Sequence, residues 1–197
     1  MIKVGLLGCG TVGSGVVKLL GQNANTIANR TGDEIVLKRI LERNADKCLQ
    51  LGVDASMITG DINDIVNDKD IDIVVELIGG IEPAFSFIIQ AMKSGKHVVT
   101  ANKDLIAVKG AELFATAREN NVDFYFEASV AGGIPIIYPL KQSLAGNEIK
   151  EVIGILNGTT NYILTKMTKD GQDFDSVLAE AQKLGYAEAD PTSDVGG

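Results

Sequence analysis

The segment that most constrains the fold is GLLGCGTVGSG, at residues 5–15. Gly8, Gly10 and Gly13 form the pattern G-x-G-x-x-G directly after an apolar run at 2–7 and at the start of a helical pattern that begins at residue 11, with Cys9 as a small spacer. Here the first glycine permits a tight turn, the second lets the backbone approach a pyrophosphate, and the third lets the helix pack closely on the strand. The segment therefore predicts a strand, a turn and a helix that bind a dinucleotide.

The chain up to residue 127 alternates short apolar runs with amphipathic stretches. This alternation predicts a parallel sheet with helices on its faces, which is an α/β fold. We expect strands at 2–7, 34–42, 72–78, 97–100 and 122–127, and helices at 11–29, 45–51, 61–67, 83–94 and 109–120.

The sequence changes character after residue 127. The run ASVAGGIPIIYPL, at 128–140, is rich in glycine and proline, which is typical of a hinge between domains. We therefore predict a first domain at 1–130 and a second that begins at 131 and continues to 197. In the second domain we expect a strand at 148–156 and helices at 159–169 and 173–184.

The charge and cysteine content narrow the possible partners. The net charge is −8 with no run of Lys or Arg, which argues against binding to nucleic acid or to an anionic membrane surface and favours a small molecule. No apolar run approaches the ~20 residues of a membrane span. Two cysteines are too few for a disulfide framework, so a cytoplasmic location is the simpler expectation.

The end of the second predicted strand leaves the choice of cofactor open. Glu42 could accept a hydrogen bond from the ribose 2′-hydroxyl of NAD, whereas Arg43, with Lys47, could pair with the 2′-phosphate of NADP. We favour NADP with NAD tolerated. The alternative is that Arg43 and Lys47 are ordinary solvated charges.

A lysine follows the strand HVVT in the segment HVVTANKDLIA. Lys103 comes three residues after Thr100, at the carboxyl edge where ligands of open α/β sheets lie. Lys103 is therefore placed to reach a nicotinamide or a substrate oxygen. The alternative is a surface lysine at the start of a helix.

Six segments in order resemble the homoserine dehydrogenase family: GLLGCGTVGSG, VVELIGG (74–80), TANK (100–103), FEASVAGGIPII (126–137), NGTTNYIL (157–164) and KLGYAEADPTSDVGG (183–197). The resemblance implies NAD(P)-dependent interconversion of L-homoserine and L-aspartate 4-semialdehyde, on the route to threonine, methionine and isoleucine. It implies a Rossmann-type doubly wound parallel sheet, followed by the beginning of a second α/β substrate and dimerisation domain. It also implies a homo-oligomer, a dimer or a tetramer, for the full-length enzyme.

The resemblance assigns roles to individual residues. Cofactor contacts fall on Gly8, Cys9, Gly10, Thr11, Val12, Gly13, Arg43, Lys103 and Gly185. Lys103 is also the catalytic-pocket lysine. Substrate contacts fall on Gly158, Thr159, Tyr186 and Glu188, of which Glu188 holds the substrate ammonium group. A monovalent cation, usually sodium, is held by backbone oxygens of Glu127, Val130, Gly132 and Ile134, although a plain hinge is the alternative there.

The family's pattern continues beyond the residues of this chain. After DVGG the family has an Asp that helps to bind homoserine and, four residues on, the lysine assigned as the principal proton donor, whereas this sequence ends at Gly197. We therefore expect a truncated form that binds cofactor better than it turns over homoserine. Two other classes stay open: a different NAD(P)-dependent oxidoreductase on the same scaffold, and a non-catalytic dinucleotide-sensing module.

Overall fold

The computed structural model describes residues 1–154, 158–184 and 186–187. The chain divides into two compact units, Met1–Tyr138 and Pro139–Gly197. Within the described ranges, no helix is both long and apolar enough to cross a membrane.

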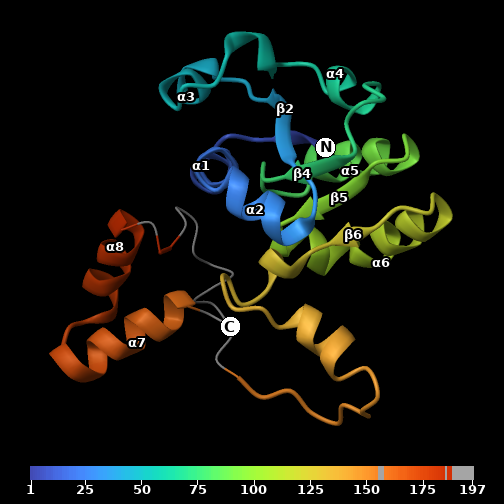
Figure 1. Cartoon of the computed structure of the whole chain (residues 1–197). Helices are drawn as coiled ribbons and strands as arrows, with labels where there is room; N and C mark the ends of the chain where they lie inside the picture. The colour runs from blue at the N-terminus through green and yellow to red at the C-terminus, as the bar shows by residue number, and fades with distance from the viewer. Residues whose placement is uncertain (155–157, 185, 188–197) are drawn as a thin grey trace. The chain divides into compact units, whose positions relative to one another are not determined.

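The first unit is built on a parallel sheet of six strands in the order β3-β2-β1-β4-β5-β6 (Figure 1). This is the strand order of the Rossmann fold, with a switch point between β1 and β4, so the predicted doubly wound sheet is confirmed. The strands are β1 (Ile2–Leu7), β2 (Ile35–Leu41), β3 (Ile58–Thr59), β4 (Ile73–Glu76), β5 (His97–Thr100) and β6 (Phe124–Tyr125).

Helices cover both faces of this sheet (Figure 1). They are α1 (Thr11–Gln22), α2 (Ala24–Thr31), α3 (Ala45–Gln50), α4 (Asn63–Val66), α5 (Ala84–Lys93) and α6 (Lys103–Glu119), with short 3₁₀ turns at Ala55–Met57 and Glu127–Ser129. Successive side chains of β1 point to opposite faces of the sheet, so the core consists of two clusters. Leu6 packs with Cys9 and Cys48 on one face, and Leu7 packs with residues of α5 and α6 on the other.

Two helices differ from their predicted bounds. The helix expected at 11–29 is broken at Asn23, which leaves helical geometry and separates α1 from α2, and α2 then ends at the left-handed Gly32. The helix expected at 109–120 begins six residues earlier, because the side chain of Asn102 accepts a hydrogen bond from the backbone N–H of Leu105 and caps the helix there. β3 was not predicted, since two residues carry too little pattern.

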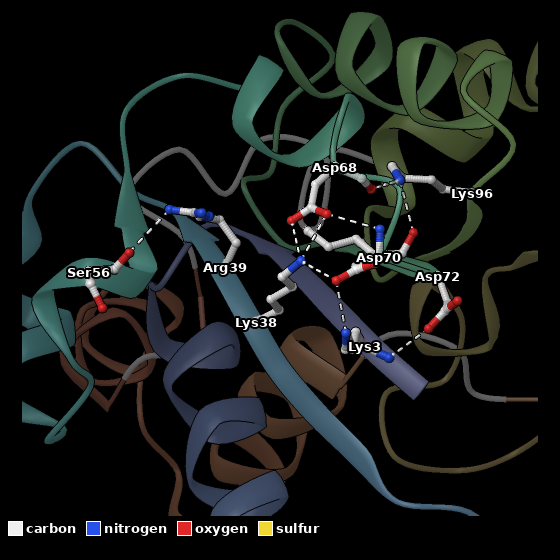
Figure 2. Close-up of polar contacts among 9 residues, drawn as sticks. Lys3, Lys38, Arg39, Ser56, Asp68, Asp70, Asp72 and Lys96 are labelled. Carbon is white, nitrogen blue, oxygen red and sulfur yellow. Dashed lines mark hydrogen bonds and ion pairs between the residues drawn. The ribbon is translucent and has the colours of Figure 1, made fainter. Parts of the chain in front are cut away.

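Charged side chains meet at the amino-terminal edge of the sheet (Figure 2). Lys38 of β2 contacts Asp68 at 2.7 Å and Asp70 at 3.2 Å, and Lys3 of β1 contacts Asp70 at 3.0 Å. Nearby, the buried Lys96 donates to the carbonyl oxygens of Asp68 at 2.6 Å and Ile71 at 2.9 Å. These contacts fix the turn between α4 and β4 at the end of the sheet opposite to the glycine turn.

The second unit contains the π-helical turn Pro139–Ser143 and two longer helices, α7 (Gly158–Asp170) and α8 (Phe174–Leu184), close to the predicted ranges. The strand predicted at 148–156 is not formed by residues 148–154, and 155–156 lie outside the described residues. A strand needs a hydrogen-bonded neighbour, and within the described part of this unit there is none.

Candidate dinucleotide and substrate site

The turn between β1 and α1 depends on its three glycines. Gly8 has a left-handed φ of +92°, and a Cβ there would lie 2.9 Å from the carbonyl oxygen of Leu77. A Cβ on Gly13 would overlap the carbonyl oxygen of Gly8, whereas one on Gly10 would meet no protein atom within 4 Å. Larger residues at the first and third positions are therefore excluded by the protein itself, and the middle position is kept open.

Helix α1 starts directly after this turn without a side-chain cap. Its first backbone N–H groups therefore have no partner within the helix and carry the positive end of the helix dipole. Thr11 and Val12, both exposed, are its first two residues. Such a terminus, next to an open glycine, suits an anion such as pyrophosphate.

A cavity of about 410 Å³ lies at the carboxyl ends of the central strands. Its volume is in the range of sites for small molecules and cofactors. It is lined by the glycine turn, the end of β2 with the start of α3, the residue after β3 and the segment from the end of β4 into α5. The lining residues are Gly8, Gly10, Leu41, Glu42, Arg43, Lys47, Gly60, Leu77, Ile78, Gly79, Glu82, Pro83 and Phe87.

Glu42 joins the end of β2 to the glycine turn. Its Oε2 accepts a hydrogen bond of 2.7 Å from the backbone N–H of Cys9, and its Oε1 accepts one of 3.1 Å from the N–H of Asn44. Burial raises the pKa of Glu42, but hydrogen bonds from the N–H groups of Asn44, Cys9 and Arg43 outweigh it, so the pKa lies below its ordinary value. The carboxylate is thus charged at neutral pH and anchors the turn, a role that the sequence did not reveal.

Arg43 and Lys47 line the same cavity and are exposed. Both follow β2, which lies beside β1 in the sheet. Their positive charges are therefore available to a ligand phosphate in this cavity, while the neighbouring Glu42 is occupied by backbone donors.

Lys103 is the first residue of α6 and is exposed at the carboxyl edge of β5. The residues before it are fixed, since the Thr100 hydroxyl donates to Glu76 at 2.6 Å and accepts from the Asn102 N–H at 3.1 Å. Lys103 therefore lies at the expected edge of the sheet.

The expected cation loop is shaped by the carboxylate of Glu127. This carboxylate accepts backbone hydrogen bonds from Ile136, Ile137 and Tyr138, and these bonds lower its pKa against the opposing effect of burial. The backbone oxygen of Glu127, which is the atom expected to bind the cation, accepts a hydrogen bond from the N–H of Val130 at 3.2 Å. Gly132, with φ of +58°, and Ile134 lie on the same loop.

In the second unit the structure brings two expected substrate residues together. The hydroxyl of Thr159 donates to the carbonyl oxygen of Tyr186 at 2.7 Å, and the ring of Tyr186 lies 5.3 Å from that of Tyr162. Gly158 begins α7 and is exposed. Gly185 and Glu188 lie outside the described residues.

Two family models match the chain in succession. The model described as "Homoserine dehydrogenase, NAD binding domain" covers residues 8–127, and the model described as "Homoserine dehydrogenase" covers residues 135–197. The chain belongs to the homoserine dehydrogenase family. Residues 8–127 thus correspond to the NAD-binding domain of the family, which agrees with the glycine turn and the cavity.

Individual homoserine dehydrogenases match the whole chain. Those of Bacillus subtilis and Synechocystis are 50% and 53% identical over 196 residues, which is 100% of this chain and 45% of each relative. The crystal structure of a homoserine dehydrogenase from Thiobacillus denitrificans is 53% identical, with a TM-score of 0.91 over 98% of this chain and 45% of that one. A hyperthermophilic archaeal homoserine dehydrogenase in complex with NADPH is 30% identical, with a TM-score of 0.80 over 98% of this chain and 64% of that one. The chain thus spans about 45% of the length of the curated homoserine dehydrogenases that it matches.

Proposed function

We propose that the natural protein carrying this chain is a homoserine dehydrogenase that interconverts L-homoserine and L-aspartate 4-semialdehyde. The observation that carries the proposal is the succession of two family matches along one chain, the NAD-binding domain first and the homoserine dehydrogenase second. A sheet with a dinucleotide cavity at its switch point supports it.

The cofactor of the proposed enzyme is NADP, with NAD accepted more weakly. The glycine turn and the first N–H groups of α1 would hold the pyrophosphate, and the open space beside Gly10 fits a close approach of backbone to ligand. Arg43, with Lys47, would pair with the 2′-phosphate. The engagement of Glu42 by backbone N–H groups favours this choice, because it leaves Glu42 less available to a ribose hydroxyl.

The reaction requires a hydride acceptor and a group that handles the hydroxyl proton. The nicotinamide, when bound, supplies the hydride acceptor. In our proposal Lys103 lies in the cofactor and substrate pocket and stabilises negative charge on the substrate oxygen. Gly158, Thr159 and Tyr186 form part of the substrate wall, Gly185 contacts the nicotinamide end, and Glu188 binds the substrate ammonium group.

The remaining assignments complete the proposal. A monovalent cation such as Na⁺ is held by the backbone oxygens of Glu127, Val130, Gly132 and Ile134, and the natural protein is a homo-oligomer in the cytoplasm. The net charge of −8 supports a small-molecule substrate over a nucleic acid or a membrane surface.

The test incubates the full-length protein with L-homoserine and NADP⁺. The absorbance of the reduced nicotinamide measures the reaction. We expect homoserine-dependent reduction of NADP⁺, and a much weaker reaction with 4-hydroxybutyrate, which lacks the ammonium group. Replacing NADP⁺ by NAD⁺, and sodium by choline, tests the cofactor and cation assignments separately. Reduction of neither nucleotide in the presence of homoserine would refute the proposed activity.

A further inference from the structure

A carboxylate lies at the carboxyl end of a central strand, where the sequence predicts an apolar strand. Glu76 is the last residue of β4, pairs in register with Leu7 of β1 and with Thr100 of β5, and is fully buried. A buried carboxylate is costly unless hydrogen-bond donors surround it. Its retention in the core therefore calls for a specific role.

Donors from both neighbouring segments surround Glu76. Its Oε1 accepts from the backbone N–H of Ile78 at 2.8 Å and of Gly79 at 3.2 Å, and its Oε2 accepts from the Thr100 hydroxyl at 2.6 Å. One oxygen therefore holds the segment after β4, and the other holds the end of β5.

The same two segments are joined a second time through Asn102. Its backbone N–H donates to the Thr100 hydroxyl at 3.1 Å, and its side-chain amide donates to the carbonyl oxygen of Gly80 at 2.6 Å. These contacts close a ring of hydrogen bonds through Glu76, the segment 78–80, Asn102 and Thr100. Thr100 is fully buried and Asn102 is 7% exposed, so water competes little for the ring.

The ring connects two parts of the candidate site. Ile78 and Gly79 line the dinucleotide cavity, and Asn102 is the N-cap of α6, which Lys103 begins. The conformation of the backbone at Lys103 is thus tied to the wall of the cavity by one buried carboxylate.

We propose that Glu76 is a positioning residue that, through Thr100, holds Lys103 in register with the bound dinucleotide. This inference rests on the proposed function, which gives Lys103 its role at the substrate oxygen. Glu76 does not touch the reactants in this proposal. Its effect comes from geometry, since a small displacement of a reacting group can cost about 100-fold in rate.

The test breaks the ring at Thr100 in the full-length protein. Thr100→Val keeps the shape of the side chain, removes the donor to Glu76 and the acceptor for Asn102, and leaves both contacts of Oε1 in place. We expect kcat for homoserine oxidation, per NADPH-binding site, to fall about tenfold or more. The Kd for NADPH is expected to change less than about threefold, because Ile78 and Gly79 stay anchored.

Two further variants separate positioning from simple destabilisation. Thr100→Ser restores the hydroxyl and should recover most of kcat. Thr116→Val removes a hydroxyl that donates to the carbonyl oxygen of Glu112 within α6, so it serves as a structural control that leaves kcat per site unchanged. Unchanged kcat in Thr100→Val, no recovery in Thr100→Ser, or an equal loss in Thr116→Val would overturn the proposal.

Amide hydrogen exchange gives a readout that does not depend on the reaction. If the wild-type protein binds NADPH but does not oxidise homoserine, the proposed activity fails, and exchange at 101–105 still decides the role of the ring. Faster exchange there in Thr100→Val than in Thr116→Val supports the positioning role, and equal exchange in the two variants refutes it.

Discussion

The carboxylate of Glu42 and the backbone N–H of Cys9 form a hydrogen bond of 2.7 Å between residues 33 positions apart in the sequence. This contact ties the end of β2 to the turn in which Gly10 leaves space for a ligand. The side chain usually considered for ribose binding is therefore also part of the framework of the turn. A change at Glu42 should consequently affect stability as well as cofactor choice.

We predict that Glu42→Ala lowers the free energy of unfolding by about 1–3 kcal/mol, because the N–H of Cys9 loses its acceptor in a buried position. Urea unfolding followed by circular dichroism measures this. Glu42→Gln, which keeps an oxygen acceptor, should lower the free energy of unfolding by less than Glu42→Ala. Glu34→Ala, an exposed carboxylate just before β2, is the matched control, and a loss of equal size there would contradict the prediction.

Arg43 provides the test of cofactor choice. We expect Arg43→Ala to weaken NADP binding by about 1–3 kcal/mol while sparing NAD, because only NADP carries the 2′-phosphate with which a guanidinium can pair. Fluorescence titration with NADPH and NADH measures both affinities. Arg30→Ala, in the last turn of α2, is the control for a general loss of positive charge. An equal loss for both cofactors would exclude a role at the 2′-phosphate.

Lys103 provides the test of the substrate pocket. Lys103→Ala in the full-length protein should abolish reduction of L-aspartate 4-semialdehyde, because the charge on the substrate oxygen would lose its cationic partner. Steady-state kinetics with NADPH measures the effect. Lys109→Ala removes a lysine of the same helix that contacts Glu112 at 3.3 Å and should retain activity. Near-normal turnover in Lys103→Ala would remove Lys103 from the site.

The sequence predicted most strongly what is encoded locally. The glycine pattern predicted the turn before α1, and the short apolar runs predicted five of the six strands, because both signals lie within a few neighbouring residues. The break at Asn23 was missed, since the apolar pattern continues across it. The strand expected at 148–156 depends on pairing with another segment, which a local pattern cannot supply.

The polar contacts of the site could not be predicted in the same way. Glu42 and Cys9 are far apart in the chain, as are Glu76 and Thr100, and their contacts arise only from strand order and register. One signal was present, namely a glutamate inside the apolar run DIVVELI. A carboxylate in a strand that is buried on both faces requires donors from neighbouring segments, so such a residue indicates a buried hydrogen-bond network.

Lys96 stabilises the edge of the sheet opposite to the cavity through hydrogen bonds to two backbone carbonyl oxygens. Burial lowers its pKa, and the nearby carboxylates of Asp68 and Asp72 offset only part of this effect. We expect Lys96→Met to lower the free energy of unfolding by about 1–3 kcal/mol, because the carbonyl oxygens of Asp68 and Ile71 lose their donor. Lys93→Met, at the exposed end of α5, is the control for urea unfolding. Equal stability of the two variants would show that the Lys96 contacts contribute nothing net.

The carboxylates of Asp68 and Asp70 should make the stability of the fold depend on pH (Figure 2). The side chain of Lys38 lowers the pKa of Asp68, and Lys3 and then Lys38 lower the pKa of Asp70. Because both carboxyls have a lower pKa when folded than when unfolded, their contribution is present above the ordinary value of 3.8 and is lost as the pH falls through the folded-state values.

Lys38→Met should therefore make stability less sensitive to acid. We expect the urea midpoint of the wild type to fall between about pH 5 and about pH 2, and that of Lys38→Met to fall less over the same range, because its carboxyls titrate nearer their unfolded-state pKa. Lys69→Met, an exposed lysine between Asp68 and Asp70, is the control and should follow the wild type. Parallel acid profiles for wild type and Lys38→Met would mean that the ion pairs in this network do not couple protonation to folding.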